Sequence, residues 1–204
     1  AVAEESGYIV ELGRWALMQA CAQGQLWERN FGFTGRVAVN VSARQCDAGV
    51  IERDVDEALK ASGLNPSRLE LELTESVLLA DRLSTQRLLT SLAARGVQIS
   101  LDDFGIGFSS LSYLRSLPIH NIKIDRSFIS GVPAVADCVA LTKTIIAMAR
   151  ALNMTVTAEG VETPEQSAFL AAHACDEVQG FLFGRPLEVP AMESLLGSMS
   201  RARA

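Results

Sequence analysis

The chain has 204 residues, of which 49% are hydrophobic and 21% charged, and its formal net charge is -6. This length is sufficient for one domain with a sizeable core, and the composition excludes a disordered, collagen-like or low-complexity protein. The acidic balance argues against a surface that binds a DNA or RNA polymer along its phosphates. The sequence also lacks an apolar run of the ~20 residues that a membrane span needs, and its start lacks the pattern of a signal peptide.

Four cysteines stand at positions 21, 46, 138 and 175, without a C-x-x-C pair or the spacing of metal ligands. We interpret them as free thiols that pack in the core of a protein in a reducing compartment. We therefore expect a cytoplasmic location, either as a free protein or as the cytoplasmic domain of a membrane-bound protein. In both cases this domain itself would make no direct membrane contact.

Helical patterns and short β-type runs alternate along the chain. Helical sequence comes first, at residues 11–27, and six strands are predicted at residues 36–41, 68–73, 97–101, 121–124, 154–158 and 177–181. Further helices are predicted at residues 47–62, 82–95, 135–152, 163–174 and from about 190 onward. The run Thr163-Pro164-Glu165-Gln166 has the pattern of a helical capping box. Strands that alternate with helices indicate βαβ units, a parallel sheet and one α/β domain over residues 1–204.

Polar residues stand at or near the carboxyl end of almost every predicted strand, although buried parallel strands are usually apolar throughout. They are Asn40, Glu72, Asp102, Lys123, Glu159 and Gln179. Each one taken alone is typical of a strand-end cap or a surface charge. Their spacing of about one βα unit, however, brings them to the same end of a sheet or barrel, which carries the active site in (β/α)8 barrels.

Carboxylates that converge with an amide and a lysine would repel one another unless a cation were bound among them. Oxygen ligands without His or Cys favour Mg²⁺ or Mn²⁺ over Zn²⁺. Asp103, next to Asp102, could reach a second ion, and two ions about 3.5–4 Å apart form a clamp for phosphoester hydrolysis. The spacing therefore predicts a metal-dependent phosphoester enzyme.

A glycine- and serine-rich segment at residues 104–110 follows the two aspartates and has the composition of a mobile loop that closes over a site. Asp103-Phe104-Gly105 also matches the magnesium motif of protein kinases. The sequence has no glycine-rich phosphate loop, lysine strand or catalytic loop of a kinase, and no P-loop pattern, so we reject both interpretations.

Six segments in order along the chain resemble the EAL-domain cyclic-di-GMP phosphodiesterase family. They are NVSARQ (40–45), ELTES (72–76), DDFGIGFSSLSYL (102–114), KIDRSF (123–128), AEGVET (158–163) and QGFLFGRP (179–186). The resemblance implies a modified TIM (β/α)8-type barrel that hydrolyses the bacterial second messenger cyclic di-GMP to linear pGpG. Such an enzyme would act in bacterial signalling that regulates biofilm formation and motility.

The resemblance also implies a role for each matching residue. The ligands of two Mg²⁺ or Mn²⁺ ions would be Asn40, Glu72, Asp102, Asp103 and Glu159. The catalytic residues would be Glu159, as a ligand or as the base that handles the attacking water, and Lys123, beside that water. Glu75 would anchor the glycine-serine loop. The residues on the substrate side would be Asp125, Glu162 and Gln179.

The sequence departs from the family in one major respect. The family's Glu-Ala-Leu motif and the arginine that follows it, which contribute a metal ligand and a phosphate contact, are not found in this chain. We therefore expect an N-terminally incomplete barrel with about six strands, and little or no activity from the 204-residue chain alone. Exposed sheet edges could be covered in a homodimer, and we expect the domain to be part of a larger multidomain signalling protein.

Two alternatives remain open from the sequence. A catalytically inactive EAL-like domain would act as a cyclic-di-GMP sensor or a protein-interaction module. A TIM-like barrel could also carry some other sugar or phosphate chemistry, because this fold supports many reactions.

Overall fold

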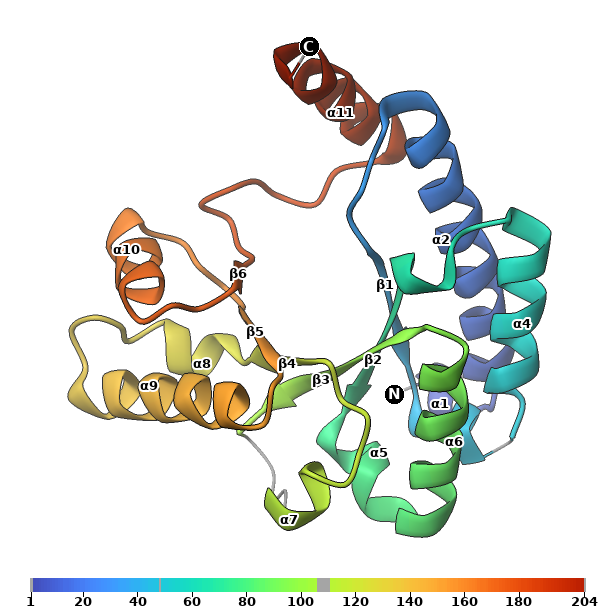
Figure 1. Cartoon of the computed structure of the whole chain (residues 1–204), viewed down its shortest axis with the longest axis horizontal. Coiled ribbons are helices and arrows are strands. Elements are labelled where there is room, and N and C mark those ends of the chain that lie inside the picture. Colours follow the sequence, from blue (N-terminus) through green and yellow to red (C-terminus); the bar gives the residue numbers. More distant parts are fainter. Residues whose placement is uncertain (1, 48, 106–110, 204) are drawn as a thin grey trace. The chain divides into compact units, whose positions relative to one another are not determined.

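The computed structural model describes residues 2–47, 49–105 and 111–203 (Figure 1). The chain divides into two compact units, each of which we describe by itself. Unit 1 comprises Ala1–Glu72, Ser91–Gln98 and Pro186–Ala204, and unit 2 comprises Leu73–Thr90 and Ile99–Arg185. Residues 106–110, which make up most of the predicted mobile loop, lie outside the described residues.

Six strands in the described part of the chain form one sheet, in the order β1-β2-β3-β4-β5-β6. Their bounds are β1 Val37–Val41, β2 Leu69–Thr74, β3 Gln98–Phe104, β4 Asn121–Ile124, β5 Thr155–Ala158 and β6 Glu177–Val178. Within unit 2, each neighbouring pair from β3 to β6 is parallel. The predicted α/β class and the six strands are confirmed, and the strand order is that of an open sheet.

Three strands end at a different residue from the one predicted, and β2 differs by a single residue, Thr74. β3 continues to Phe104, so Asp102 and Asp103 lie within the strand. β6 stops at Val178 because the chain turns at Gly180, where the backbone of Val161 lies too close for any side chain. A Cβ on Gly180 would lie 2.1 Å from the carbonyl oxygen of Val161.

Unit 1 contains β1, the first part of β2 and several helices, one of which packs against β1. The helices are α1 Val2–Glu5, α2 Ile9–Phe31, α3 Ala43–Asp47, α4 Ile51–Ser62 and α11 Val189–Arg203, with a 3₁₀ turn at Pro66–Arg68. The predicted helix at 47–62 was wrong at its start, because Gly49 adopts a left-handed φ of 65° between α3 and α4. Buried Leu17 and Cys21 on α2 belong to the core of this unit.

Unit 2 contains short helices next to the strand ends and longer helices between strands. They are α5 Glu75–Ala80, α6 Arg82–Ala94 (which ends in unit 1), α7 Leu111–Leu114, α8 Arg126–Ile129, α9 Ala136–Ala151 and α10 Pro164–Ala172. The capping box of α10 is confirmed: Thr163 Oγ1 accepts the Gln166 N–H, and Gln166 Oε1 accepts the Thr163 N–H. Asn153, with φ 59°, follows the end of α9.

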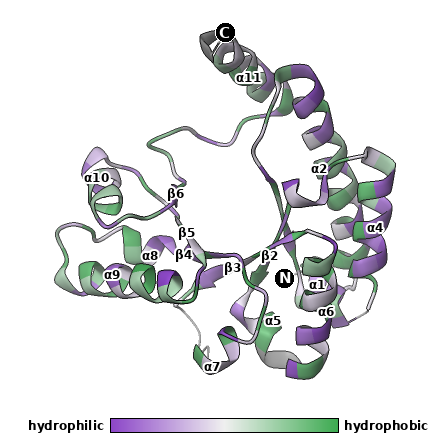
Figure 2. Ribbon diagram, in the orientation of Figure 1, coloured by the Kyte–Doolittle hydropathy of each residue, from purple (hydrophilic) through white to green (hydrophobic). Residues whose placement is uncertain are grey.

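The hydrophobic core follows the amphipathic pattern of the helices, several of which carry both hydrophobic and hydrophilic residues along their length (Figure 2). In unit 2 the strands contribute completely buried side chains such as Ile99, Ile122 and Val156. The four cysteines are free; Cys21 is buried and the other three are half-buried, so core packing was predicted correctly for Cys21 alone. Among the helices of the described residues, none has the length and hydropathy that crossing a bilayer requires.

Candidate metal centre

A bulge in β3 brings two consecutive aspartates to one place. Leu101 pairs with Ile122 and Phe104 pairs with Ile124, so β3 advances by one residue more than β4 over this interval. Asp103 has a φ of 53°, a left-handed conformation that Asp adopts more readily than most residues. In a regular strand the two side chains would point to opposite faces, whereas the bulge redirects one of them.

Three carboxylates in unit 2 meet next to this bulge. Asp102, Asp103 and Glu159, which directly follows β5, each offer one carboxylate oxygen, and these atoms lie within 4.8 Å of one another. Partial burial and then the negative charges of Asp102 and Asp125 raise the pKa of Asp103. Oxygen donors that repel one another in this way fit a hard divalent cation such as Mg²⁺ or Mn²⁺.

Lys123 on β4 lies between two of these carboxylates. Its Nζ atom is 3.0 Å from Asp102 Oδ1 and 2.7 Å from Glu159 Oε1, and its side chain is only 7% exposed. The lysine offsets one of the three negative charges, and a divalent cation would offset the other two. Asp102 Oδ1 is buried and is held by the ion pair with Lys123, with no well-aligned hydrogen bond from the described residues.

A buried polar network lies two residues before the charged side chains on the same strands. Asn121 Nδ2 donates to Ser100 Oγ at 3.0 Å and to Thr157 Oγ1 at 3.1 Å, and all three residues are buried. Because a slip of one residue would break every one of these bonds, the network specifies the register of β3, β4 and β5. The register in turn positions Lys123 beside Asp102. This network was not predicted from the sequence, although its polar residues stand out in otherwise apolar strands.

Glu75, the first residue of α5, contacts the segment that follows β3. Its Oε1 atom accepts the backbone N–H of Gly105 at 2.8 Å. Gly105 has a φ of 104°, and a Cβ at this position would lie 2.9 Å from the ring of Phe128. A glycine is therefore required where Glu75 holds the chain.

A cavity of about 180 Å³ adjoins Glu159. Three of the predicted site residues, Glu159, Glu162 and Gln179, line it. The other lining residues are Arg126, Gly160, Gly180 and Phe181. Arg126 and Phe181 were not predicted as site residues, although both lie in segments that carry the family resemblance.

Asp125 caps the short helix α8 through a hydrogen bond from the Ser127 N–H to Oδ1, at 2.9 Å. Burial raises the pKa of Asp125, but the hydrogen bonds from Ser127 and from the Arg126 backbone, together with the Arg126 charge, outweigh it, so the pKa is lowered overall. This carboxylate is close enough to contribute to the raised pKa of Asp103.

Two of the predicted metal ligands belong to unit 1, whereas the carboxylate cluster belongs to unit 2. Asn40 is exposed on β1, and Glu72 is buried on β2. Each stands close to the carboxyl end of its strand, as the sequence predicts.

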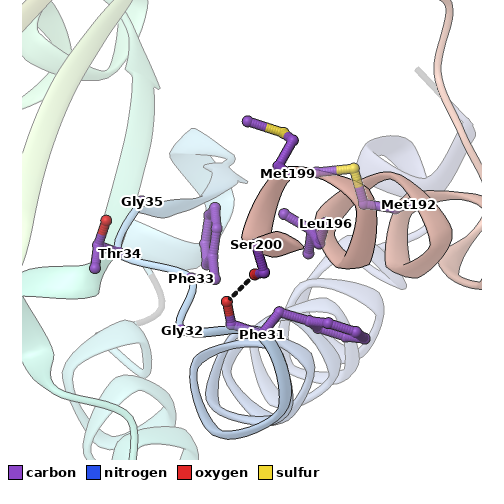
Figure 3. Close-up of a pocket in the computed structure, with 9 residues that line it drawn as sticks. All are labelled: Phe31, Gly32, Phe33, Thr34, Gly35, Met192, Leu196, Met199 and Ser200. Carbon is purple, nitrogen blue, oxygen red and sulfur yellow. Dashed lines mark hydrogen bonds between the residues drawn. The ribbon is translucent and has the colours of Figure 1, made fainter. Parts of the chain in front are cut away.

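A larger cavity of about 530 Å³ lies in unit 1 and has a different character (Figure 3). Its lining residues are Phe31, Gly32, Phe33, Thr34, Gly35, Met192, Leu196, Met199 and Ser200. Ser200 Oγ donates a hydrogen bond of 2.6 Å to the carbonyl oxygen of Phe31, and none of the described lining residues is charged. This cavity contains none of the predicted site residues and offers no group for metal binding or hydrolysis.

A profile of the EAL domain matches residues 1–186. The chain is 44% identical to the bifunctional diguanylate cyclase/cyclic di-GMP phosphodiesterase MucR of Pseudomonas aeruginosa, over 98% of this chain and 29% of that protein. It is also 44% identical to the cyclic di-GMP phosphodiesterase NbdA of the same organism, over 96% of this chain and 25% of that protein. The chain thus spans about a quarter of the length of these curated relatives.

Solved structures resemble the chain as well. The PaMucR phosphodiesterase in complex with c-di-GMP matches with a TM-score of 0.90 and 42% identity, over 94% of this chain and 77% of that chain. Klebsiella pneumoniae BlrP1, in a complex with manganese and c-di-GMP, matches with a TM-score of 0.73 and 25% identity, over 87% of this chain and 45% of that chain.

Proposed function

The chain belongs to the EAL domain family, and on that premise we propose that it hydrolyses cyclic di-GMP to linear pGpG with the help of divalent metal ions. The observation that carries the proposal is the convergence of Asp102, Asp103 and Glu159 around Lys123. A sensor would need to recognise the ligand but would have no use for a lysine held between metal-binding carboxylates. The geometry therefore favours an enzyme over a binding module.

Two ions, Mg²⁺ or Mn²⁺, would be held by Asp102, Asp103 and Glu159, and we propose Asn40 and Glu72 as further ligands from the family resemblance. Bound there, the ions would supply positive charge to the scissile phosphate and make a water molecule easier to deprotonate. Manganese in the BlrP1 complex supports this choice of cation for the family.

Two side chains, Glu159 and Lys123, would take part in the reaction in different ways. Glu159 would hold or accept the proton of the attacking water, whose oxygen forms a bond to phosphorus. Lys123, 2.7 Å from Glu159, would stabilise the negative charge that develops on the phosphate oxygens. The phosphorus–O3′ bond breaks, the 3′ oxygen leaves as a hydroxyl group after protonation, and the water oxygen remains on the new 5′-phosphate.

The substrate side of the site would be formed by Glu162, Gln179 and Asp125. Glu162 and Gln179 line the cavity that adjoins Glu159, so a ligand bound there would extend toward the carboxylates. Asp125, which also caps α8, would line the edge of the substrate side. Glu75 would hold the segment after β3 through Gly105.

Product analysis tests the proposed function. The 204-residue chain, and the same chain extended by the family's Glu-Ala-Leu segment, are incubated with cyclic di-GMP and Mn²⁺ or Mg²⁺, and pGpG is measured by chromatography. We expect pGpG release from the extended form, little or none from the 204-residue chain alone, and none from either in EDTA. The control Glu165→Gln, on the exposed first turn of α10, should leave the rate unchanged. Tight binding of cyclic di-GMP that is recovered intact from the extended, metal-loaded form would contradict the proposal and support a sensor.

A further inference from the structure

The cavity beside Glu159 contains a basic side chain that the proposed hydrolysis does not use. Arg126, the first residue of α8, lines the cavity of about 180 Å³ together with Glu159, Glu162 and Gln179. It is the one basic residue among the described residues of this lining. Its guanidinium forms no ion pair and no hydrogen bond within the described part of the chain, and the residue is exposed. Its positive charge is therefore available to a ligand.

The aliphatic part of the Arg126 side chain packs against the turn that follows Glu159. A Cβ on Gly160 would lie 2.6 Å from Arg126 Cβ and 2.8 Å from Arg126 Cγ, so the two chain segments are in direct contact. Gly160 also has a left-handed φ of 69°, which a side chain would strain. The aliphatic part is thus held next to Glu159 while the charged end remains accessible to solvent.

The charges around the cavity indicate which part of a ligand Arg126 would bind. A cyclic dinucleotide carries two phosphodiester groups, and the hydrolysis described above acts on one of them at the carboxylate cluster. The second phosphate would then lie near Glu159 and Glu162, where its negative charge would be repelled unless a cation were present. An arginine can donate two parallel hydrogen bonds to such a phosphate.

We propose that Arg126 binds the non-scissile phosphate of the cyclic dinucleotide in this cavity; the inference rests on the proposed function. Phe181 lines the same cavity, and the Arg185 guanidinium lies 4.6 Å from the centroid of its ring, so a second cation stands close to the cavity. Arg126 is a binding residue in this account, since the group it holds does not react. Its loss should weaken substrate binding without slowing the chemical step.

Steady-state kinetics test the inference in whichever form of the chain releases pGpG. The variants are Arg126→Gln, Arg126→Lys and the control Arg150→Gln, at an exposed position of α9. Arg126→Gln should raise KM for cyclic di-GMP by about tenfold or more and change kcat by less than about twofold. Arg126→Lys, which keeps the charge but not the paired hydrogen bonds, should recover part of the loss. Bis(p-nitrophenyl) phosphate has a single phosphodiester, so its KM should be the same in all variants.

Calorimetric titration of cyclic di-GMP in EDTA gives a readout that does not depend on turnover, and Arg126→Gln should bind about tenfold more weakly there as well. An unchanged KM and an unchanged affinity in Arg126→Gln, with a wild type that releases pGpG, would overturn this inference alone. An equal rise in KM for both substrates would also overturn it, since Arg126 would then act on the scissile group or on the fold. A wild type that releases no pGpG in any form would instead contradict the proposed function.

Discussion

The two cavities of this protein differ in size, in lining and in the kind of structure that forms them. The larger, of about 530 Å³, lies in unit 1 between α11 and the end of α2, and its described lining residues are uncharged. The smaller, of about 180 Å³, lies in unit 2 at the ends of strands and is lined by carboxylates, an amide and an arginine. Volume is therefore a poor guide to the site in this protein, and the chemistry of the lining residues is the better one.

The backbone explains the difference between the two regions. In unit 2 a bulge in β3 and left-handed turns at Asp103, Gly105 and Gly160 direct side chains to one place. In unit 1 the left-handed Gly32 serves as the C-terminal cap of α2, next to the apolar cavity. Substitutions around the smaller cavity and the carboxylate cluster should therefore affect turnover, and substitutions around the apolar cavity should affect stability alone.

The largest effect is expected from Glu159→Gln, which replaces a carboxylate that contacts Lys123 with a neutral amide. Turnover of cyclic di-GMP should fall by roughly 10³-fold or more, because Glu159 contacts the lysine and, in the proposed mechanism, would also serve the metal and the attacking water. The rate of pGpG release measures the effect. A variant that keeps even a tenth of the wild-type rate would show that Glu159 is not part of the catalytic site.

Gly160→Ala and Gly32→Ala form a matched pair, one in each region. Both glycines have left-handed φ angles, 69° and 63°, but an added Cβ meets Arg126 at Gly160 and meets nothing within 4 Å at Gly32. Each alanine should cost about 1 kcal/mol or more in the free energy of unfolding through backbone strain.

Turnover separates the two variants of this pair. Gly160→Ala should lower kcat/KM by at least tenfold, because a small displacement of Glu159 disturbs the reacting geometry and a displacement of Arg126 weakens substrate binding. Gly32→Ala should keep the wild-type value once folded. Urea unfolding measures the loss of stability in each variant. Equal turnover in the two variants would contradict the expectation that only the smaller cavity contributes to the reaction.

Leu196→Ala tests the apolar cavity directly. Leu196 on α11 is 7% exposed, so its truncation should lower the free energy of unfolding by about 2–3 kcal/mol. The rate of pGpG release should not change at a temperature where the variant is folded. A loss of turnover in the folded variant would show that this cavity contributes to the reaction.

The smallest effect is expected from Asp125→Ala, which removes the cap of α8 and should cost about 1 kcal/mol at neutral pH. The pKa of Asp125 is lowered in the folded protein, so its ionised form stabilises the fold above the unfolded pKa of about 3.9. This contribution should be lost as the pH falls through the lowered value. Asp125→Asn keeps a capping group but cannot ionise, and its stability should lack this pH dependence. A cost that is the same at neutral and acid pH would contradict the explanation.

Much of the fold could be predicted from local patterns, because strand periodicity and helix caps depend on residues that are close together in the sequence. The capping box at Thr163 and the strand at residues 121–124 are examples. Asp102, Lys123 and Glu159 could also be predicted to converge, because they stand at or near the predicted strand ends, and the structure brings them together. The metal-binding and catalytic roles of these residues remain predictions.

The remaining features depend on contacts between distant segments. The bulge at Asp103 follows from the pairing of β3 with β4, and the register of these strands depends on the bonds of Asn121 to Ser100 and Thr157. The place of Arg126 follows from packing against Gly160. Such contacts leave no periodic signal in the sequence: the polar residues of the network stand out in apolar strands, but which residues pair becomes visible only when the chain is folded.

Hydrolysis of cyclic di-GMP in ¹⁸O-labelled water with Mn²⁺, followed by mass spectrometry of the product, tests the central claim most directly. If Asp102, Asp103, Lys123 and Glu159 direct a water molecule onto one phosphate, the product should be pGpG with one ¹⁸O in its terminal phosphate. Asp102→Asn should form no labelled product under the same conditions. Unlabelled pGpG, or labelled pGpG formed by Asp102→Asn at the wild-type rate, would contradict the account.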